Sequence, residues 1–384
     1  MKRRILAQSR LLVLLVTVAV AGAASALMTG ARDGGALADG GTTTSSSGRP
    51  TLPPVIHAPS NPPSRRTPLV IALHGSGGTP ALMESVTGLD STADRNGFTV
   101  AYFDTTPANW GDPANITNIG AFIKQMVAGG KIDPARVYVV GFSLGGYASF
   151  RAGCDLSRQV AAIAVVSNAM APLARKPCKL ARPVSELNIA GSRDLFPVHQ
   201  TPSKAISADQ TAAIWRSLNG CGTVATSEQV GPTTETTWNG CDDGSSVGQY
   251  IVNGGVHAWP GGSDATGPDT AYDASQAIWD FFARHRAPSA ASPPVRLSRL
   301  RVTSRSVRAS FSVGERTARA SARLVAHGRT VAARSVTLHR GSAALLVLPV
   351  PRSRTSRSAT LSVTLADRYG RKLVLRRSLR LGAG

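Results

Sequence analysis

The fold is decided by the stretch Arg136-Val-Tyr-Val-Val-Gly-Phe-Ser-Leu-Gly145. Its first half is a run of β-branched and aromatic residues, which is typical of a buried parallel strand. The run passes through Gly141-Phe-Ser-Leu-Gly145 into a segment with helical character. Glycines on both sides of Ser143 remove side chains that would collide in a sharp strand-to-helix turn. Such a turn would hold the Ser143 hydroxyl above a sheet edge, at a helix N-terminus whose backbone N–H groups can bind an oxyanion.

The same five-residue pattern occurs a second time, at residues 244–248 around Ser246. Gly and Ser are common in this chain, so the pattern alone is weak evidence. The second copy follows Cys-Asp-Asp rather than an apolar strand, and no helical pattern follows it. We therefore predict a loop at Ser246 and assign the nucleophile to Ser143.

The first 26 residues have the three regions of a secretory signal peptide. Residues 1–10 carry four basic side chains and no acid, and residues 11–21 are apolar apart from Thr17. Ala24-Ser25-Ala26 then fits the cleavage site. An uncleaved anchor is the alternative, although the apolar run is short for a membrane span. We expect an extracellular protein with no stable membrane span after cleavage.

Four cysteines in an exported chain predict two disulfides. Three pairings are possible, and the neighbour pairing closes the shortest loops. We therefore predict the bonds Cys154–Cys178 and Cys221–Cys241. A zinc site is the alternative, but no C-x-x-C pair or histidine cluster supports one, so no metal is expected.

The net charge of +21 is concentrated at the C-terminal end. Residues 291–384 hold 19 Arg and one Lys against Glu315 and Asp367, a net charge of +18. Such a segment could bind an anionic cell-wall polymer, or it could be a solvated surface that is merely rich in arginine. Nucleic acid is not expected, because the chain is exported and has no recognition helix or aromatic–basic interleaving.

Composition and periodicity divide the chain into five segments. In residues 67–286, apolar strands alternate with helical patterns, which predicts a mostly parallel α/β sheet. After that linker, short runs alternate with period two, which predicts an antiparallel sandwich of immunoglobulin or fibronectin-III type. The segments are the signal peptide 1–26, a Gly/Thr/Ser/Pro linker 27–66 with at most an edge strand at 54–57, a catalytic α/β domain 67–286, a linker 287–295 and a basic β-sandwich 296–384.

A serine nucleophile needs a base and an acid, which follow the serine in the order Asp or Glu, then His. His257 lies in a glycine-rich loop directly after a predicted strand. A general base in such a loop would lie at the edge of the sheet, close to the serine. Asp194 ends an apolar run and is our candidate acid. We expect His285 at the surface of the closing helix. The other rivals are His199, Asp155, Asp209, Asp242 and Asp243.

Four ordered motifs together resemble the secreted esterase/polyhydroxybutyrate depolymerase family, which includes feruloyl and acetylxylan esterases. The motifs are Leu73-His-Gly-Ser-Gly-Gly78, Gly141-Phe-Ser-Leu-Gly-Gly146, Gly191-Ser-Arg-Asp194 and Gly254-Gly-Val-His-Ala-Trp-Pro-Gly261. The chain departs from the family pattern at Val256, which replaces a glycine, and at 196–199, where Phe-Pro-Val-His stands instead of Val-Pro-Tyr. These departures concern the substrate rim more than the reacting groups.

The resemblance implies an α/β-hydrolase fold with a catalytic triad of Ser143, Asp194 and His257. It also implies oxyanion donors from the backbone of Ser76 and Leu144. No metal or organic cofactor is required by this chemistry. The neighbour-paired disulfides suit the family as well.

These inferences predict a secreted serine esterase that acts on polyhydroxyalkanoate or on acyl esters of polysaccharides. Trp110 and Trp259 could line the acyl subsite, or could be core aromatics. The alternative function is a wall-associated binding protein that is catalytically inactive or transfers acyl groups to an alcohol.

Overall fold

The computed structural model describes residues 53–63, 66–105, 110–170, 177–195, 207–287, 295–303, 305–313, 318–338, 343–350 and 358–380. The predicted signal peptide and most of the linkers 27–66 and 287–295 lie outside these residues. Among the helices of the described residues, none combines the length and the apolar character that crossing a membrane requires.

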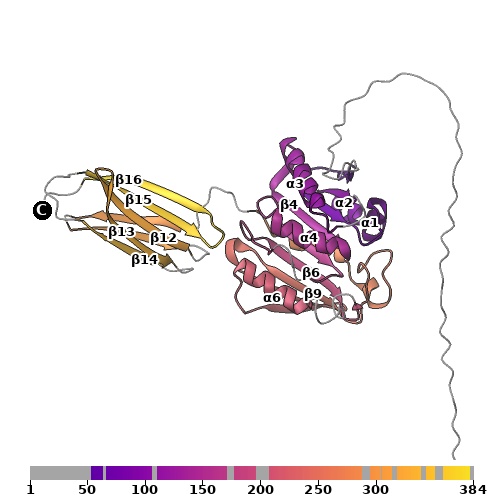
Figure 1. Cartoon of the computed structure of the whole chain (residues 1–384). Coiled ribbons are helices and arrows are strands. Elements are labelled where there is room, and N and C mark those ends of the chain that lie inside the picture. The colour runs from indigo at the N-terminus through magenta and orange to yellow at the C-terminus, as the bar shows by residue number, and fades with distance from the viewer. Residues whose placement is uncertain are drawn as a thin grey trace, which may run out of the picture. The chain divides into compact units, whose positions relative to one another are not determined.

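The α/β part contains one mixed nine-stranded sheet in the order β1-β3-β2-β4-β5-β6-β9-β8-β7 (Figure 1). The six strands from β3 to β9 in this order pair in parallel, whereas β1, β8 and β7 pair antiparallel at the two ends. The strands are β1 (Val55–His57), β2 (Thr67–Leu73), β3 (Thr99–Phe103), β4 (Ile132–Phe142), β5 (Ala162–Val166), β6 (Ser185–Gly191), β7 (Thr226–Val230), β8 (Thr233–Trp238) and β9 (Val247–Val252).

The parallel centre of the sheet agrees with the sequence, but the hairpin β7–β8 was not expected. Its strands are dominated by Thr, Glu and Gln, and every residue of β7 is exposed. Without an apolar alternation, such a segment has no periodic signal that indicates a strand. The short strand β1 lies within the expected edge-strand stretch 54–57.

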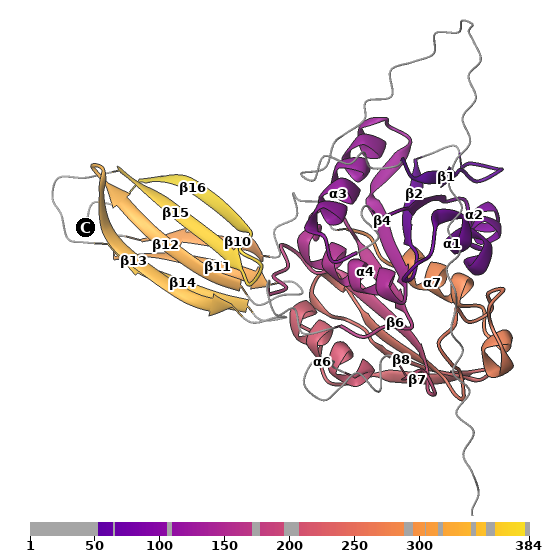
Figure 2. The ribbon, with the colours of Figure 1, turned by 45° about the vertical axis from the view of Figure 1, so that its right-hand side comes forward.

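Helices cover both faces of the sheet, as the second view shows (Figure 2). Apolar residues of α3, α4 and α6 pack on one face, and those of α1, α2 and α7 pack on the other. The helices are α1 (Pro80–Thr87), α2 (Leu89–Asn96), α3 (Pro113–Ala128), α4 (Leu144–Asp155), α6 (Ala208–Asn219) and α7 (Ala274–Ala283), with 3₁₀ turns η1 (Asp242–Gly244) and η2 (Gly267–Ala271).

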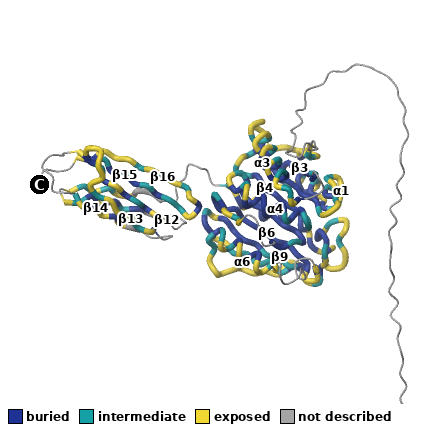
Figure 3. The backbone as a smooth tube through the Cα atoms, viewed as in Figure 1, coloured by how far each residue is buried: buried dark blue, intermediate teal, exposed yellow. Residues whose placement is uncertain are grey.

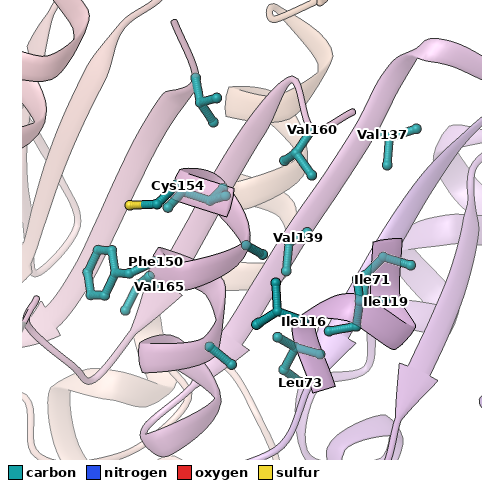
Figure 4. Packing of buried hydrophobic residues seen from close by; sticks show 14 of the residues in the cluster. Ile71, Leu73, Ile116, Ile119, Val137, Val139, Phe150, Cys154, Val160 and Val165 are labelled. Atoms are coloured by element: carbon teal, nitrogen blue, oxygen red, sulfur yellow. The ribbon is translucent and has the colours of Figure 1, made fainter. Parts of the chain in front are cut away.

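The central strands are buried on both sides, which explains their continuous apolar sequences (Figure 3). On one face, Ile71 and Val139 from the strands contact a layer that includes Ile119 of α3 and Phe150 of α4 (Figure 4). This double covering leaves only the strand ends and their loops open to solvent. A site on this sheet therefore forms at the carboxyl ends of the strands.

Both disulfides of the neighbour pairing are present in the structure. Cys154 and Cys178 have Cα atoms 5.1 Å apart, and Cys221 and Cys241 have Cα atoms 4.1 Å apart. The first bond ties the end of α4 to the segment before β6, and the second ties the residue after α6 to the loop before β9.

The C-terminal part contains two antiparallel sheets, in the orders β10-β11-β14 and β13-β12-β15-β16. Alternate residues such as Phe311, Leu324 and Leu361 are buried and form one core. The immunoglobulin or fibronectin-III type remains a prediction. The strands are β10 (Val295–Val302), β11 (Ser306–Val313), β12 (Ala318–Ala326), β13 (Arg329–Leu338), β14 (Ala343–Pro349), β15 (Ser358–Asp367) and β16 (Lys372–Arg380).

Candidate active site

Ser143 lies at a strained turn between β4 and α4. Its backbone angles are φ 50° and ψ −117°, a conformation that residues with a side chain rarely adopt. A Cβ atom on Gly141 would lie 2.1 Å from the carbonyl oxygen of Gly145, and a Cβ atom on Gly145 would lie 2.2 Å from that of Leu73. The two glycines of the motif are therefore required because backbones meet at this turn.

The structure brings Ser143, His257 and Asp194 into one hydrogen-bonded row. Nε2 of His257 lies 3.0 Å from Oγ of Ser143, and Nδ1 lies 3.0 Å from both carboxylate oxygens of Asp194. The Asp194 side chain is fully buried, whereas 28% of the His257 side chain is exposed. The row thus runs from a buried carboxylate to an imidazole that solvent can reach.

Asp194 and His257 come from the ends of adjacent strands. β6 and β9 are parallel neighbours, and the loop with Asp194 follows β6 while the loop with His257 follows β9. The two loops are joined by a hydrogen bond from the Arg193 amide to the Gly255 carbonyl, 2.8 Å long. Residues 63 positions apart in the sequence therefore lie side by side.

A second buried carboxylate, Asp269, supports the His257 loop. Its Oδ2 accepts from the amide of Val256 at 2.9 Å, and its carbonyl accepts from the amide of Gly261 at 2.8 Å. Burial raises the pKa of Asp269, and the nearby charge of Asp194 adds to this effect. Sequence reasoning missed this residue, because it lies in a short 3₁₀ turn that carries no motif. Val256, which stands where the family pattern has a glycine, is 39% exposed. This exposure agrees with a place at the rim of the site.

The loop after β2 approaches the serine and carries the predicted oxyanion donor Ser76. A Cβ atom on Gly75 would lie 3.4 Å from Cβ of Ser143. Within the described residues, the amides of Ser76 and Leu144 donate to no other backbone group. Ser143 itself is half-buried. Amides without a backbone acceptor, in the loop that approaches this serine and at the start of α4, are what an oxyanion hole needs.

Trp110 holds this loop in place. Its Nε1 donates to the carbonyl of His74 at 2.8 Å, and Nδ1 of His74 donates to the carbonyl of Gly75 at 2.7 Å. His74 Nε2 lies 3.3 Å from Asp104. Trp110 is only 2% exposed. A ring that is this buried does not line an open subsite.

Trp259 is likewise a core residue. It is fully buried, and its Nε1 donates to Oγ of Ser275 at 3.0 Å. The prediction that Trp110 and Trp259 bind substrate is therefore corrected in favour of the core interpretation, because neither ring reaches the surface.

The rival residues are held elsewhere, and His199 lies outside the described residues together with 196–198. Asp155 pairs with Arg151, and Asp209 accepts from Gln249 at 2.7 Å. Asp242 and Asp243 form the 3₁₀ turn η1. His285 is 6% exposed, so its predicted surface position is wrong: the residue follows the end of α7 and turns back into the core.

No protein-family model matches the chain. It is 28% identical over 215 residues to a feruloyl esterase B of Piromyces equi, which covers 50% of this chain and 40% of the relative. It is 28% identical over 239 residues to a bifunctional acetylxylan esterase/xylanase of Neocallimastix patriciarum, which covers 59% of this chain and 32% of the relative. A shorter match, 34% identical over 105 residues, covers 24% of this chain and 25% of a poly(3-hydroxyalkanoate) depolymerase C of Paucimonas lemoignei. The chain thus spans less than half the length of each of these relatives.

Among solved structures, an acetyl xylan esterase from Aspergillus awamori aligns with a TM-score of 0.43 and 14% identity, over 60% of this chain and 93% of that chain. The relatives place this chain among homologues of carboxylic ester hydrolases, and its large mixed sheet is α/β-hydrolase-like. The named relatives are a feruloyl esterase, an acetylxylan esterase and a polyhydroxyalkanoate depolymerase, which is the group that the sequence motifs resemble.

Proposed function

We propose that this chain is a serine esterase in which Ser143 is the nucleophile, His257 the general base and Asp194 the residue that orients it. The observation that carries the proposal is the row of 3.0 Å contacts from Asp194 through His257 to Ser143 at a strained strand-to-helix turn. A serine at such a turn is unreactive without a base, and the base needs a fixed ring orientation.

The mechanism follows from these positions. His257 removes the Ser143 proton as Oγ attacks the ester carbonyl, and buried Asp194 stabilises the imidazolium that forms. The amides of Ser76 and Leu144 stabilise the oxyanion. The alcohol departs with the proton from His257, and water then hydrolyses the acyl-enzyme by the reverse proton path.

The substrate class that we propose is a polymer-linked acyl ester, in polyhydroxyalkanoate or in an acylated polysaccharide. The names of the relatives support this range. We further propose that the protein works outside the cell, since two disulfides form and persist in an oxidising compartment.

The test is covalent labelling of the full chain with a fluorophosphonate, followed by a screen of esters. We expect stoichiometric labelling of Ser143 and hydrolysis of at least one of methyl ferulate, acetylated xylan and polyhydroxybutyrate. Failure to label Ser143 would contradict the esterase proposal and favour the alternative, a catalytically inactive binding protein. Labelling with acyl transfer to an added alcohol, and no free acid, would identify an acyltransferase.

A second candidate function is binding of an acidic polysaccharide, such as one of a cell wall, by the outer face of the four-stranded sheet. In this sheet, Ser362 of β15 lies between Arg323 of β12 and Arg376 of β16. Four positions along, Ala366 lies between Arg319 and Lys372 in the same way. We call these four cations the basic grid.

The spacing of the basic grid suits an extended polyanion. Cations on β12 and on β16, the two strands that flank β15, are about 10 Å apart, and the two rows are about 13 Å apart. All four side chains are exposed, and none has an ion pair among the described residues. The residues directly between the paired cations, Ser362 and Ala366, are small and leave room for a sugar ring.

Retention of the full chain on immobilised polygalacturonate tests this candidate. Replacing Arg319, Arg323, Lys372 and Arg376 by Gln should reduce retention at low salt by at least about tenfold. The matched control replaces four other exposed arginines by Gln, namely Arg299 and Arg301 of β10, Arg305 of the turn after β10, and Arg308 of β11. Equal losses in both variants would show that overall charge matters and the grid does not.

A further inference from the structure

The turn that follows β5 contacts both reacting loops through two consecutive side chains, Ser167 and Asn168. Ser167 is buried and has φ +55°, a conformation that a non-glycine residue adopts only when its surroundings impose it. Its amide donates to the carbonyl of Ile189 in β6 at 2.8 Å. The turn therefore lies between the strand that carries the nucleophile and the strand that carries the acid.

Asn168 contacts the peptide that links Ser143 to Leu144. Its Nδ2 donates to the carbonyl oxygen of Ser143, which also accepts from the amide of Gly146 at 2.9 Å. In a trans peptide, the C=O and the following N–H point in opposite directions in one plane. A donor that holds the Ser143 carbonyl thus also aims the Leu144 N–H.

Ser167 contacts the loop of the base. Its Oγ donates to the carbonyl of Ala258, the residue after His257, at 3.1 Å. Asn168 is itself fixed, because its Oδ1 accepts from the amide of Ala169 at 2.7 Å and its carbonyl accepts from Nδ2 of Asn188 at 2.8 Å. The side chain is therefore held at both of its polar ends, and the backbone of the same residue is held by Asn188.

We propose that Asn168 and Ser167 are positioning residues of the esterase reaction: Asn168 orients the Leu144 amide toward the oxyanion, and Ser167 holds the His257 loop at the right distance from Ser143. This inference rests on the proposed function. An oxyanion donor contributes to catalysis only when it points to where charge develops, so its orientation affects the transition state more than substrate binding.

The test compares Asn168→Asp with the parent, as full chains, on a soluble ester. Aspartate has the same shape but its ionised carboxylate cannot donate to the Ser143 carbonyl. We expect kcat to fall by about tenfold to a hundredfold, with KM within about twofold, because a lost oxyanion donor reduces kcat by about a hundredfold or more. Asn168→Ala should show the same split. Ser167→Ala should lower kcat by a smaller factor.

Asn219 provides a matched control. It is a fully buried asparagine whose side chain makes two hydrogen bonds to the backbone of one residue. The side chain accepts from the Val184 amide at 3.0 Å and donates to the Val184 carbonyl at 2.7 Å. It lies at the opposite end of β6 from Asp194. Asn219→Asp should lower the melting temperature at least as much as Asn168→Asp while leaving kcat unchanged.

The outcomes separate this inference from the proposed function. A parent protein that neither hydrolyses esters nor labels at Ser143 overturns both. An active parent whose Asn168→Asp and Asn168→Ala variants keep kcat within about twofold overturns the positioning role alone. Equal changes in kcat and KM in the Asn168 variants would show that Asn168 has a purely structural role. A kcat loss in Asn219→Asp that matches the loss in Asn168→Asp would show the same.

Discussion

Oγ of Ser246 lies 3.0 Å from Nε2 of His285, the same distance that separates Oγ of Ser143 from Nε2 of His257. Each copy of the five-residue motif thus has its serine paired with a histidine in the described part of the chain. The two pairs differ in what surrounds them. Nδ1 of His285 contacts the carbonyl of Phe281 rather than a carboxylate, and both members of the second pair are buried.

The first prediction separates the two serines. Ser143→Ala should lower kcat by about 10⁶-fold, because a triad acts as a unit. Ser246→Ala should leave kcat unchanged and lower the free energy of unfolding by about 1–2 kcal/mol, since it removes buried hydrogen bonds to Asn239 and His285. Steady-state kinetics and urea titrations measure both effects. The reverse pattern would move the active site to Ser246.

The second prediction concerns the base and the acid. His257→Ala should be as damaging as Ser143→Ala, whereas Asp194→Asn should lower kcat by about 10⁴-fold, because the ring loses its orientation but keeps its reactivity. Single-turnover acylation rates measure this. An active His257→Ala beside an inactive His199→Ala would transfer the role of base to His199.

The third prediction concerns acid stability. Burial, with a smaller contribution from the charge of Arg284, lowers the pKa of His285 to about 4, against an ordinary value of 6.5. Below pH 6.5, His285 is protonated in the unfolded chain but stays neutral in the folded chain. The free energy of unfolding therefore falls as the pH drops towards 4. The loss is about 3 kcal/mol. His285→Gln should reduce the fall in unfolding free energy between pH 7 and pH 4 by about this amount; an unchanged fall would contradict the assignment.

The fourth prediction concerns the opposite end of the pH range. Glu186 is fully buried between Ile163 and Val247 of the neighbouring strands, and neither of its carboxylate oxygens has a hydrogen-bond partner among the residues that the structure describes. Burial raises the pKa of Glu186 well above its ordinary value. The unfolded chain releases this proton above about pH 4.5 while the folded chain keeps it, so stability falls as pH rises.

Glu186→Gln removes this titration with little change in shape. The variant should gain stability relative to the parent progressively between pH 5 and pH 9, as measured by the urea midpoint. A stability difference between the two proteins that is independent of pH over this range would show that Glu186 is ionised in the fold.

Much of the site could be predicted because its signals are local. The apolar strand before Ser143 and the glycines beside it specify the strained turn, and the close backbone contacts at Gly141 and Gly145 give the reason. His257 and Asp194 could be predicted because parallel strands bring their carboxyl ends to one edge. The hairpin β7–β8 could not be predicted, because its strands are polar and do not bury an apolar face. Backbone pairing places them in the sheet instead: β8 pairs with β9, and β7 pairs with β8.

Local sequence is enough to predict the alternation of apolar strands and helices in the parallel part of the sheet, the sharp turn at Ser143 and the loops that carry Asp194 and His257, since each depends on neighbouring residues. Three features follow from the packing of distant segments: which aromatic rings are core, which serine–histidine pair is open to solvent, and the contact of Asn168 with the Ser143 carbonyl. Burial and contact between distant segments depend on how whole strands pack. A pattern of adjacent residues therefore cannot predict this burial or these contacts.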